Sequence, residues 1–264
     1  MTVKFIIDIM LIALAGFTAS ACGSSNGGQN GFADQKLTVS AAISLKDAFT
    51  EIGKNFESRH PGLKVDFNFG SSGDLKQQII AGAPVDVFAS ASAKEMDELD
   101  GTGLIVKDTL IEPAVNDLVL VVPAASSINI AAMADLGKSG INRIALGNPE
   151  TVPAGRYARD ALSFYGLWDN LKPKLVYGES VRQVLDYVAQ DEVDAGLVYT
   201  TDAKSRADKV RVVLTAPAGS HKPIIYPMAV ITGSKQEQLA RRFLALVASD
   251  ESRHVFEKLG FKSG

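Results

Sequence analysis

Short apolar runs alternate with longer amphipathic stretches from about residue 36 to the end of the chain. The apolar runs are bounded by Gly, Pro, Asn and Asp and predict strands at 37–41, 63–69, 85–89, 118–122, 143–146, 174–177, 195–199, 210–214 and 224–231. The helical periodicity between them predicts helices at 44–59, 72–81, 92–99, 154–166, 180–190, 235–249 and 251–259. Strands and helices in alternation favour an α/β fold with largely parallel sheets.

Serines, glycines and a proline gather where four predicted strands pass into helices. Ser44 and Asp47 have the spacing of a capping box, Ser72 begins a second helix, Pro153 suits a first helical position, and Ser180 precedes a fourth helix. In a parallel α/β sheet such turns meet at the carboxyl edge, where ligands bind. Helix starts present unpaired N–H groups and partial positive charge, so a converging set would hold an anion. A single serine of this kind is more simply a helix cap.

Composition limits the class of partner. The 264 residues are 46% hydrophobic and 22% charged, which is typical of a globular protein with a sizeable core. The 27 Lys and Arg residues are balanced by 30 Asp and Glu residues, so no basic surface for a nucleic acid is expected.

The first residues have the pattern of an export signal. Lys4 precedes an apolar run at 9–17 that is too short to span a bilayer, and small residues lead to Cys22, the only cysteine. This pattern resembles a bacterial lipoprotein signal, which implies cleavage of residues 1–21 and a lipid anchor on Cys22. A plain secretory peptide or an uncleaved anchor is the alternative. Residues 22–35 have the polar, Gly-rich composition of a flexible tether.

A family resemblance covers the whole chain from about residue 36. It is carried by Ala41-Ala42-Ile43-Ser44-Leu45, Phe69-Gly70-Ser71-Ser72-Gly73-Asp74-Leu75, Gln78-Ile79-Ile80-Ala81-Gly82-Ala83-Pro84-Val85-Asp86-Val87-Phe88, Gly147-Asn148-Pro149-Glu150-Thr151-Val152-Pro153-Ala154-Gly155, Glu179-Ser180-Val181-Arg182, Gly196-Leu197-Val198-Tyr199-Thr200-Thr201-Asp202 and Tyr226-Pro227. These blocks resemble, in order and separation, the periplasmic molybdate-binding proteins of ABC transporters, a branch of the type II periplasmic binding proteins.

The resemblance implies a set of uncharged ligand donors. By position, Ser44 and Ser72 would bind the oxyanion through hydroxyl and amide, Ala154 and Val181 through backbone N–H groups, and Tyr199 through its phenol. No direct protein ligand to the metal and no cofactor are expected, because the metal is bound as its oxyanion. Gly73 stands where many members of the family have another residue, a change that bears on the stiffness of the loop.

The resemblance also implies two α/β lobes, each a mostly parallel sheet flanked by helices, joined by two crossover segments. Lobe 1 would contain 36–115 and 224–264, and lobe 2 would contain 116–223. The crossings would lie at Asn116-Asp117 and at 221–223. The anion would bind in the cleft as a hinge closes the lobes over it.

The implied function is capture of molybdate, and also tungstate, by an extracytoplasmic monomer that delivers it to an ABC transporter permease. Donors without a carboxylate suit a fully ionised dianion, whereas phosphate near pH 7 keeps a proton that needs an acceptor. Sulfate or another small anion is an alternative ligand. A serine hydrolase using Ser44 or Ser72 is a less favoured alternative, since no Gly-x-Ser-x-Gly elbow is present.

Other polar residues are expected to be structural. The three histidines, His60, His221 and His254, lack metal-site spacing and are expected on the surface or in loops. Asp74 and Glu179 are expected to act at helix starts, and Trp168 is expected to pack in the core or a loop. Arg156 and Arg182 could bias the field over the cleft or be solvated.

Overall fold

The computed structural model describes residues 35–264. The predicted signal peptide and Cys22 lie outside these residues, as does the predicted tether up to residue 34. None of the helices in 35–264 has the length and apolar character needed to cross a membrane.

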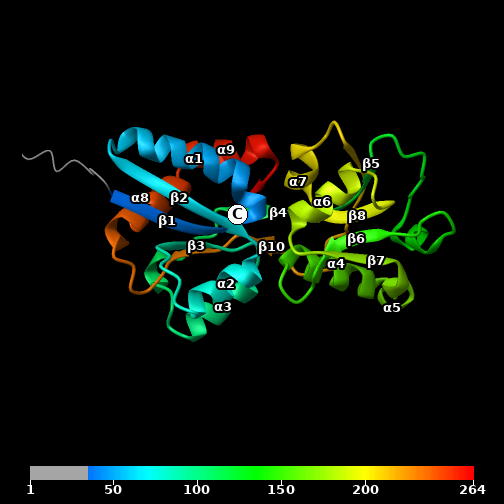
Figure 1. Cartoon of the computed structure of the whole chain (residues 1–264), viewed down its shortest axis with the longest axis horizontal. Coiled ribbons are helices and arrows are strands. Elements are labelled where there is room, and N and C mark those ends of the chain that lie inside the picture. Colours follow the sequence, from blue (N-terminus) through cyan, green and yellow to red (C-terminus); the bar gives the residue numbers. More distant parts are fainter. Residues whose placement is uncertain (1–34) are drawn as a thin grey trace, which may run out of the picture. The chain divides into compact units, whose positions relative to one another are not determined.

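One half of the structure is built on a four-stranded sheet with the order β11-β3-β1-β2. Helices α1, α8 and α9 lie on one side of this sheet and helices α2 and α3 on the other (Figure 1). The strands are β1 (Gln35–Ala42), β2 (Leu63–Gly70), β3 (Val87–Ala89) and β11 (Met228–Val230). The helices are α1 (Lys46–Arg59), α2 (Ser72–Ile80), α3 (Ala93–Gly101), α8 (Glu237–Val247) and α9 (Asp250–Leu259).

The other half is built on a five-stranded sheet with the order β7-β6-β8-β5-β9. Helices α4 and α6 both contact the central strands β6 and β8 and lie on opposite faces (Figure 1). The strands are β5 (Leu118–Pro123), β6 (Ile144–Gly147), β7 (Leu175–Gly178), β8 (Ala195–Tyr199) and β9 (Val210–Thr215). The helices are α4 (Pro153–Phe164), α5 (Trp168–Leu171), α6 (Val181–Ala189) and α7 (Thr200–Ser205).

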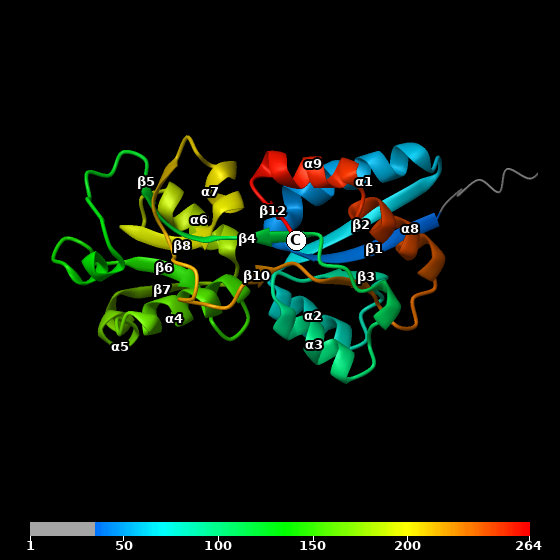
Figure 2. The same ribbon diagram turned by 180° about the vertical axis from the view of Figure 1, so that it is seen from behind.

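A small antiparallel sheet lies between the two larger sheets in both views (Figures 1 and 2). Its order is β10-β4-β12, and it pairs Asn116 with Ile224. The strands are β4 (Ala114–Asn116), β10 (Ile224–Ile225) and β12 (Lys262–Ser263). Short 3-10 turns complete the structure: η1 (Ile43–Leu45), η2 (Lys107–Thr109), η3 (Met133–Gly137) and η4 (Lys172–Lys174).

The predicted α/β class is confirmed, and the sheets are more mixed than expected. Within each larger sheet one strand runs against the others, β11 in the first and β5 in the second. Both reversed strands follow segments that enter from the small sheet. The single strand predicted at 224–231 is two strands, interrupted at Tyr226-Pro227.

Burial on both faces explains why the central strands read as continuous apolar runs. Every residue of β5 is buried, and so is every residue of β8. Helices cover both faces of the sheet, so neither face carries the polar alternation of a half-exposed strand. The candidate site begins at the carboxyl ends of β1, β2, β6, β7 and β8.

Candidate functional site

Ser44, Ser72, Ala154, Val181 and Tyr199 line one small cavity. None of these five residues is more than 3% exposed. The centre of a water molecule can occupy a volume of about 10 Å³ in this cavity. The rest of the lining is also uncharged and consists of Ala42, Ile43, Gly70, Ser71, Ala91, Val152 and Pro153. The fold therefore brings together five positions that are distant along the chain.

Ser44 enters the cavity from the end of β1. It lies in the 3-10 turn η1, and the predicted capping box with Asp47 is wrong, because Leu45 is the N-cap of α1 and no side chain caps that helix. The Ser44 hydroxyl instead lies 3.1 Å from the phenol oxygen of Tyr226. Ser44 is thus free of a capping role.

Ser72 enters from the end of β2 as the first residue of α2. Its neighbour Ser71 is the N-cap, with its Oγ accepting from the Asp74 N–H at 3.2 Å and donating to the Asp74 carboxylate at 2.6 Å. Asp74 therefore lies in the first turn of α2, at the helix start where it was expected, while Ser71 provides the cap. The Ser72 Oγ accepts a hydrogen bond from the Ala91 N–H at 3.0 Å, so its own proton can be donated into the cavity.

Ala154 and Val181 stand at the starts of α4 and α6. Pro153 occupies the first position of α4, as predicted, and Ser180 caps α6 by accepting from the Gln183 N–H at 3.2 Å, also as predicted. The first four N–H groups of a helix lack intrahelical partners. The N–H groups of Ala154 and Val181 belong to this set, and the adjoining helix dipoles favour negative charge.

Tyr199 ends strand β8, and its buried phenol oxygen has no hydrogen-bond partner within the described part of the chain. Burial raises the pKa of Tyr199 well above its usual value, so the phenol keeps its proton and remains a donor. A buried polar atom without a partner is uncommon in folded proteins. Here it borders the same cavity as the two serines, where a ligand oxygen would satisfy it.

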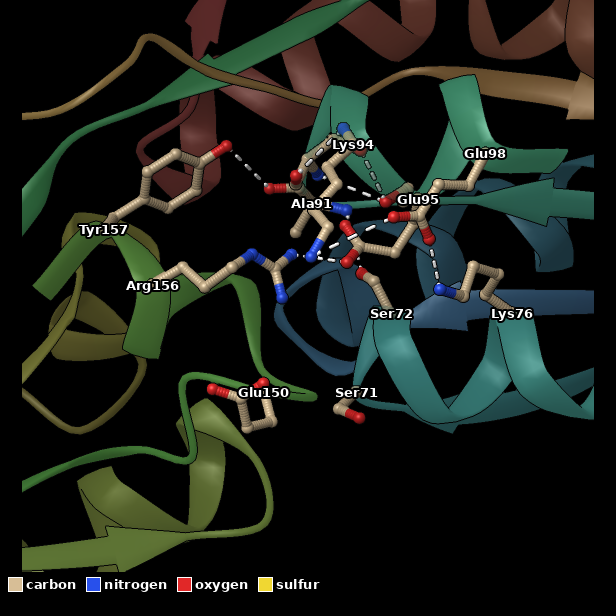
Figure 3. A network of polar contacts seen from close by, with 12 residues as sticks. Ser71, Ser72, Lys76, Ala91, Lys94, Glu95, Glu98, Glu150, Arg156 and Tyr157 are labelled. Atoms are coloured by element: carbon tan, nitrogen blue, oxygen red, sulfur yellow. Dashed lines mark hydrogen bonds and ion pairs between the residues drawn. The ribbon is translucent and has the colours of Figure 1, made fainter. Parts of the chain in front are cut away.

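Two arginines join the halves on either side of the cavity. Arg156 of α4 is 9% exposed and donates to the Glu95 carboxylate of α3 at 2.5 Å (Figure 3). Arg182 of α6 donates to Asp47 of α1 and to Asp202 of α7, each at 2.6 Å. The prediction that these arginines are solvated is therefore wrong. Both guanidinium groups form ion pairs with carboxylates and neither lines the cavity, so the lining is neutral.

A glycine permits a close backbone approach between the halves. The Gly73 N–H donates to the Thr151 carbonyl oxygen at 3.0 Å, and a Cβ on Gly73 would lie only 2.4 Å from that oxygen. Gly73, noted in the sequence as a departure from the family pattern, is thus the residue that lets α2 meet the loop before α4.

Three residues outside the cavity lining were not identified from the sequence as part of the site. Tyr226 contacts Ser44 from outside the cavity and accepts a hydrogen bond from Asn116. Asp202 lies fully buried against Arg182. Burial raises the pKa of Asp202 to about 6, although the Arg182 charge acts to lower it. Tyr226-Pro227 was recognised only as part of a family block, and no local signal assigned it a partner.

The remaining polar predictions have simple structural outcomes. Trp168 is partly buried and packs against the core, as predicted. The Nδ1 atoms of His60, His221 and His254 each lie within hydrogen-bond distance of a backbone carbonyl oxygen. Within residues 35–264, no group of three or more His, Cys, Asp and Glu side chains is placed to hold a metal ion.

Comparison with known proteins decides the family. Residues 37–262 match the family model described as bacterial extracellular solute-binding protein. The chain belongs to the bacterial extracellular solute-binding proteins. A relative in this family from Bacillus subtilis, a putative ABC transporter substrate-binding lipoprotein, is 42% identical over 96% of this chain and 97% of its own length. The molybdate-binding protein of Haemophilus influenzae is 38% identical over 88% of this chain and 91% of its own.

A solved structure supports both the family and the fold. The substrate-binding domain of a putative molybdenum ABC transporter from Clostridium difficile is 40% identical, covers 87% of this chain and 99% of its own, and superposes with a TM-score of 0.68. These solute-binding relatives confirm the resemblance described from the sequence, and the expected two-lobed type II periplasmic binding protein fold is confirmed with them.

Proposed function

We propose that this solute-binding protein captures molybdate, and also tungstate, in the cavity between its halves and delivers it to an ABC transporter permease. The observation that carries the proposal is the convergence of five uncharged donor residues on one cavity, including a buried phenol that has no hydrogen-bond partner in the residues that the structure describes. Relatives named as molybdate-binding support the choice of ligand.

The chemistry of the lining favours a fully ionised tetrahedral anion. Every oxygen of such a dianion accepts hydrogen bonds, and Ser44, Ser72, Tyr199 and the two helix starts present donors. No carboxylate lines the cavity. Phosphate, which carries a proton near neutral pH, would leave that proton without a charged acceptor. Sulfate has the right charge and a smaller size, so it is the main competing ligand.

We propose that ligand binding and lobe closure are one event. The proposed lobes contain residues 36–115 with 224–264, and residues 116–223. Ser44 and Ser72 come from the first set, and Ala154, Val181 and Tyr199 from the second. The donor shell is complete only when both sets meet, so the anion would stabilise the closed arrangement. A permease could then distinguish loaded from empty protein by shape.

A purely binding role is favoured over hydrolysis. The hydroxyls of Ser44 and Ser72 have Tyr226 and the Ala91 N–H as partners, and neither of these groups is the histidine base that a serine nucleophile requires. We therefore propose no enzymatic activity and no cofactor, and we propose that the protein acts as a monomer.

Calorimetric titration tests the ligand directly. The purified protein is titrated with molybdate, tungstate, sulfate and phosphate at pH 7. We expect submicromolar binding of molybdate and tungstate, much weaker binding of sulfate and no binding of phosphate. Absence of heat with both metal oxyanions, or tighter binding of sulfate, would contradict the proposal.

We also propose that the protein is held outside the cytoplasm by a lipid on Cys22. The sequence pattern before Cys22 and the lipoprotein name of the Bacillus subtilis relative support this anchor. Mass spectrometry of the membrane-extracted protein is expected to find residues 1–21 absent and a diacylated N-terminal cysteine. An unmodified thiol would exclude the anchor while leaving the ligand assignment untouched.

A further inference from the structure

We propose that Tyr226 and Asn116 fix the direction of hydrogen bonding at Ser44, so that this hydroxyl keeps its proton to donate to the bound anion. The consequence is selection against oxyanions that carry a proton. This inference rests on the proposed anion-binding function and extends it to two residues that do not line the cavity.

The chain of contacts starts at Asn116, which is 6% exposed at the end of β4. Its Oδ1 accepts a hydrogen bond from the Asp117 N–H at 3.0 Å, which fixes the orientation of the amide. The amide nitrogen therefore donates, to the Thr201 hydroxyl at 2.9 Å and to the Tyr226 phenol oxygen at 3.1 Å. Both of its N–H groups are used, and it offers Tyr226 no acceptor.

Tyr226 transmits this constraint to the cavity. Its side chain is 0% exposed, and its phenol oxygen already accepts from Asn116. The acceptor within reach of the phenol proton is the Ser44 Oγ, 3.1 Å away. The opposite arrangement, with Ser44 donating to Tyr226, would leave a buried phenol proton unsatisfied, which is costly. Tyr226 therefore donates, and Ser44 keeps its own proton for the ligand.

Packing holds the relay in place. The Tyr226 ring meets the rings of Phe261 and Tyr199 edge to face, with centroids 5.2 and 6.2 Å away. Tyr226 follows β10, which pairs with β4 at Asn116, so both relay residues lie where the chain passes between the two larger sheets. The direction of the Ser44 hydroxyl is thus set by two residues of the connection between the larger sheets.

The hydroxyl of Ser72 also accepts a hydrogen bond from the protein, but from a different donor. The Ala91 N–H fills an acceptor site of the Ser72 hydroxyl, so this hydroxyl also presents its proton. Each serine then has one lone pair occupied and its proton available to the ligand, so the proton of hydrogen phosphate meets donor protons where it needs an acceptor. Selectivity would follow from hydrogen-bond direction as well as from cavity size.

A double-mutant cycle tests the relay. Tyr226→Phe keeps the ring and removes only the phenol oxygen, after which the Ser44 hydroxyl can rotate and accept. We expect molybdate binding to weaken about three- to tenfold. Phosphate at pH 7 should compete with molybdate at lower concentration in this variant than in the parent. In a Ser44→Ala background, Tyr226→Phe should have no further effect, since its effect passes through Ser44.

Two controls separate positioning from general structural damage. Combined with Ser72→Ala, Tyr226→Phe should keep its full penalty, because Ser72 is fixed by Ala91 rather than by Tyr226. Tyr177→Phe, the same change at a residue 45% exposed, should alter nothing. Unfolding temperatures of all variants report whether the fold is retained.

The outcomes distinguish this inference from the proposed function. If the parent protein binds molybdate but Tyr226→Phe binds equally well, the relay is wrong. The relay is also wrong if the Tyr226→Phe penalty persists undiminished in the Ser44→Ala background, which would indicate a general packing effect. If the parent does not bind molybdate at all, the proposed function itself fails.

Discussion

At the scale of single residues, the site depends on donors that the protein leaves unsatisfied. Tyr199 is the clearest case, because its buried phenol oxygen has no hydrogen-bond partner among residues 35–264. Leaving a buried polar atom unpaired costs about 1–3 kcal/mol, which a ligand oxygen would recover on binding. The Tyr199 phenol thus lowers the stability of the ligand-free protein and raises its affinity for the anion.

The unpaired phenol predicts opposite effects of Tyr199→Phe on the stability of the ligand-free protein and on molybdate binding. Without ligand, the free energy of unfolding should stay the same or rise by up to about 1 kcal/mol, since an unpaired buried group is removed. Molybdate affinity should fall about 10- to 100-fold, measured by calorimetry. A variant that loses both stability and affinity would indicate that the phenol has an internal partner.

Gly73→Ala makes a second residue-scale prediction. An alanine Cβ would lie 2.4 Å from the Thr151 carbonyl oxygen, so α2 and the loop before α4 could not keep their present approach. Alanine favours a helix over glycine by about 1 kcal/mol, so the unliganded protein should not lose stability. Molybdate affinity should nevertheless fall about 5- to 100-fold, as expected for overpacking of about 1–3 kcal/mol.

The matched control for this change is Gly101→Ala in α3. A Cβ on Gly101 would meet nothing within 4 Å, so the substitution should leave affinity unchanged. Unaltered binding by Gly73→Ala would show that the contact with Thr151 is not part of the ligand-bound state.

The residues that line the site could be predicted from the sequence, whereas the residues that contact them from behind could not. Sequence alone placed Ser44 and Ser72 shortly after strands and Tyr199 at the end of one, where the structure has them. Their convergence on one cavity came from the family resemblance, because spacing along the chain does not encode distance between halves. The partners Asn116 and Tyr226 are 110 positions apart and join only through the tertiary fold.

At the scale of elements, helix starts and buried ion pairs do most to shape the site. Glu95 of α3 and Arg156 of α4 are 1% and 9% exposed, and each keeps one polar side-chain atom without a hydrogen bond. Such a pair is held by mutual attraction against a large desolvation cost. Opening the cleft would rehydrate both charges, so the pair couples the position of α3 to that of α4.

Breaking this pair should hinder closure. Arg156→Met leaves the Glu95 carboxylate buried and unpaired in the closed arrangement, at a cost of about 3–5 kcal/mol. We expect molybdate affinity to fall about a hundredfold or more, measured by calorimetry. The double variant Glu95→Met with Arg156→Met should recover most of the affinity, because an apolar pair carries no such cost. Wild-type affinity in the single variant would contradict this coupling.

Element prediction succeeded where periodicity was strong and failed for short segments. The starts of α4 and α6 follow from Pro153 and Ser180. Strands β4 and β12, with three and two residues, carry no pattern long enough to recognise. The capping box expected at Ser44 failed because the chain inserts a 3-10 turn before α1, which moves the serine out of the cap and into the cavity.

At the scale of the whole molecule, burial of a charged group links stability to pH. The pKa of Asp202 is raised by burial to about 6, above its ordinary value of 3.8. Between these two values the folded state holds a proton that the unfolded state has released, so this group's contribution to stability falls as pH rises. The contribution is fully present below about pH 4 and is lost as pH rises through about 6.

Asp202→Asn should remove this dependence. We expect the difference in unfolding free energy, parent minus variant, to decrease as pH rises from 4 to 7, measured by denaturant unfolding at several pH values. Comparing the two proteins cancels the carboxylates that they share. A difference that is constant across this range would show that Asp202 titrates at its ordinary pKa.

The central claim is that uncharged groups from both halves enclose a metal oxyanion, and a crystal structure of the protein grown with tungstate tests it most directly. Anomalous scattering from tungsten locates the ion without reference to protein density. The account predicts one strong peak in the cavity, within hydrogen-bond distance of Ser44, Ser72 and Tyr199 and of the N–H groups of Ala154 and Val181. A peak elsewhere, or an ion held by lysine or arginine side chains, would contradict it.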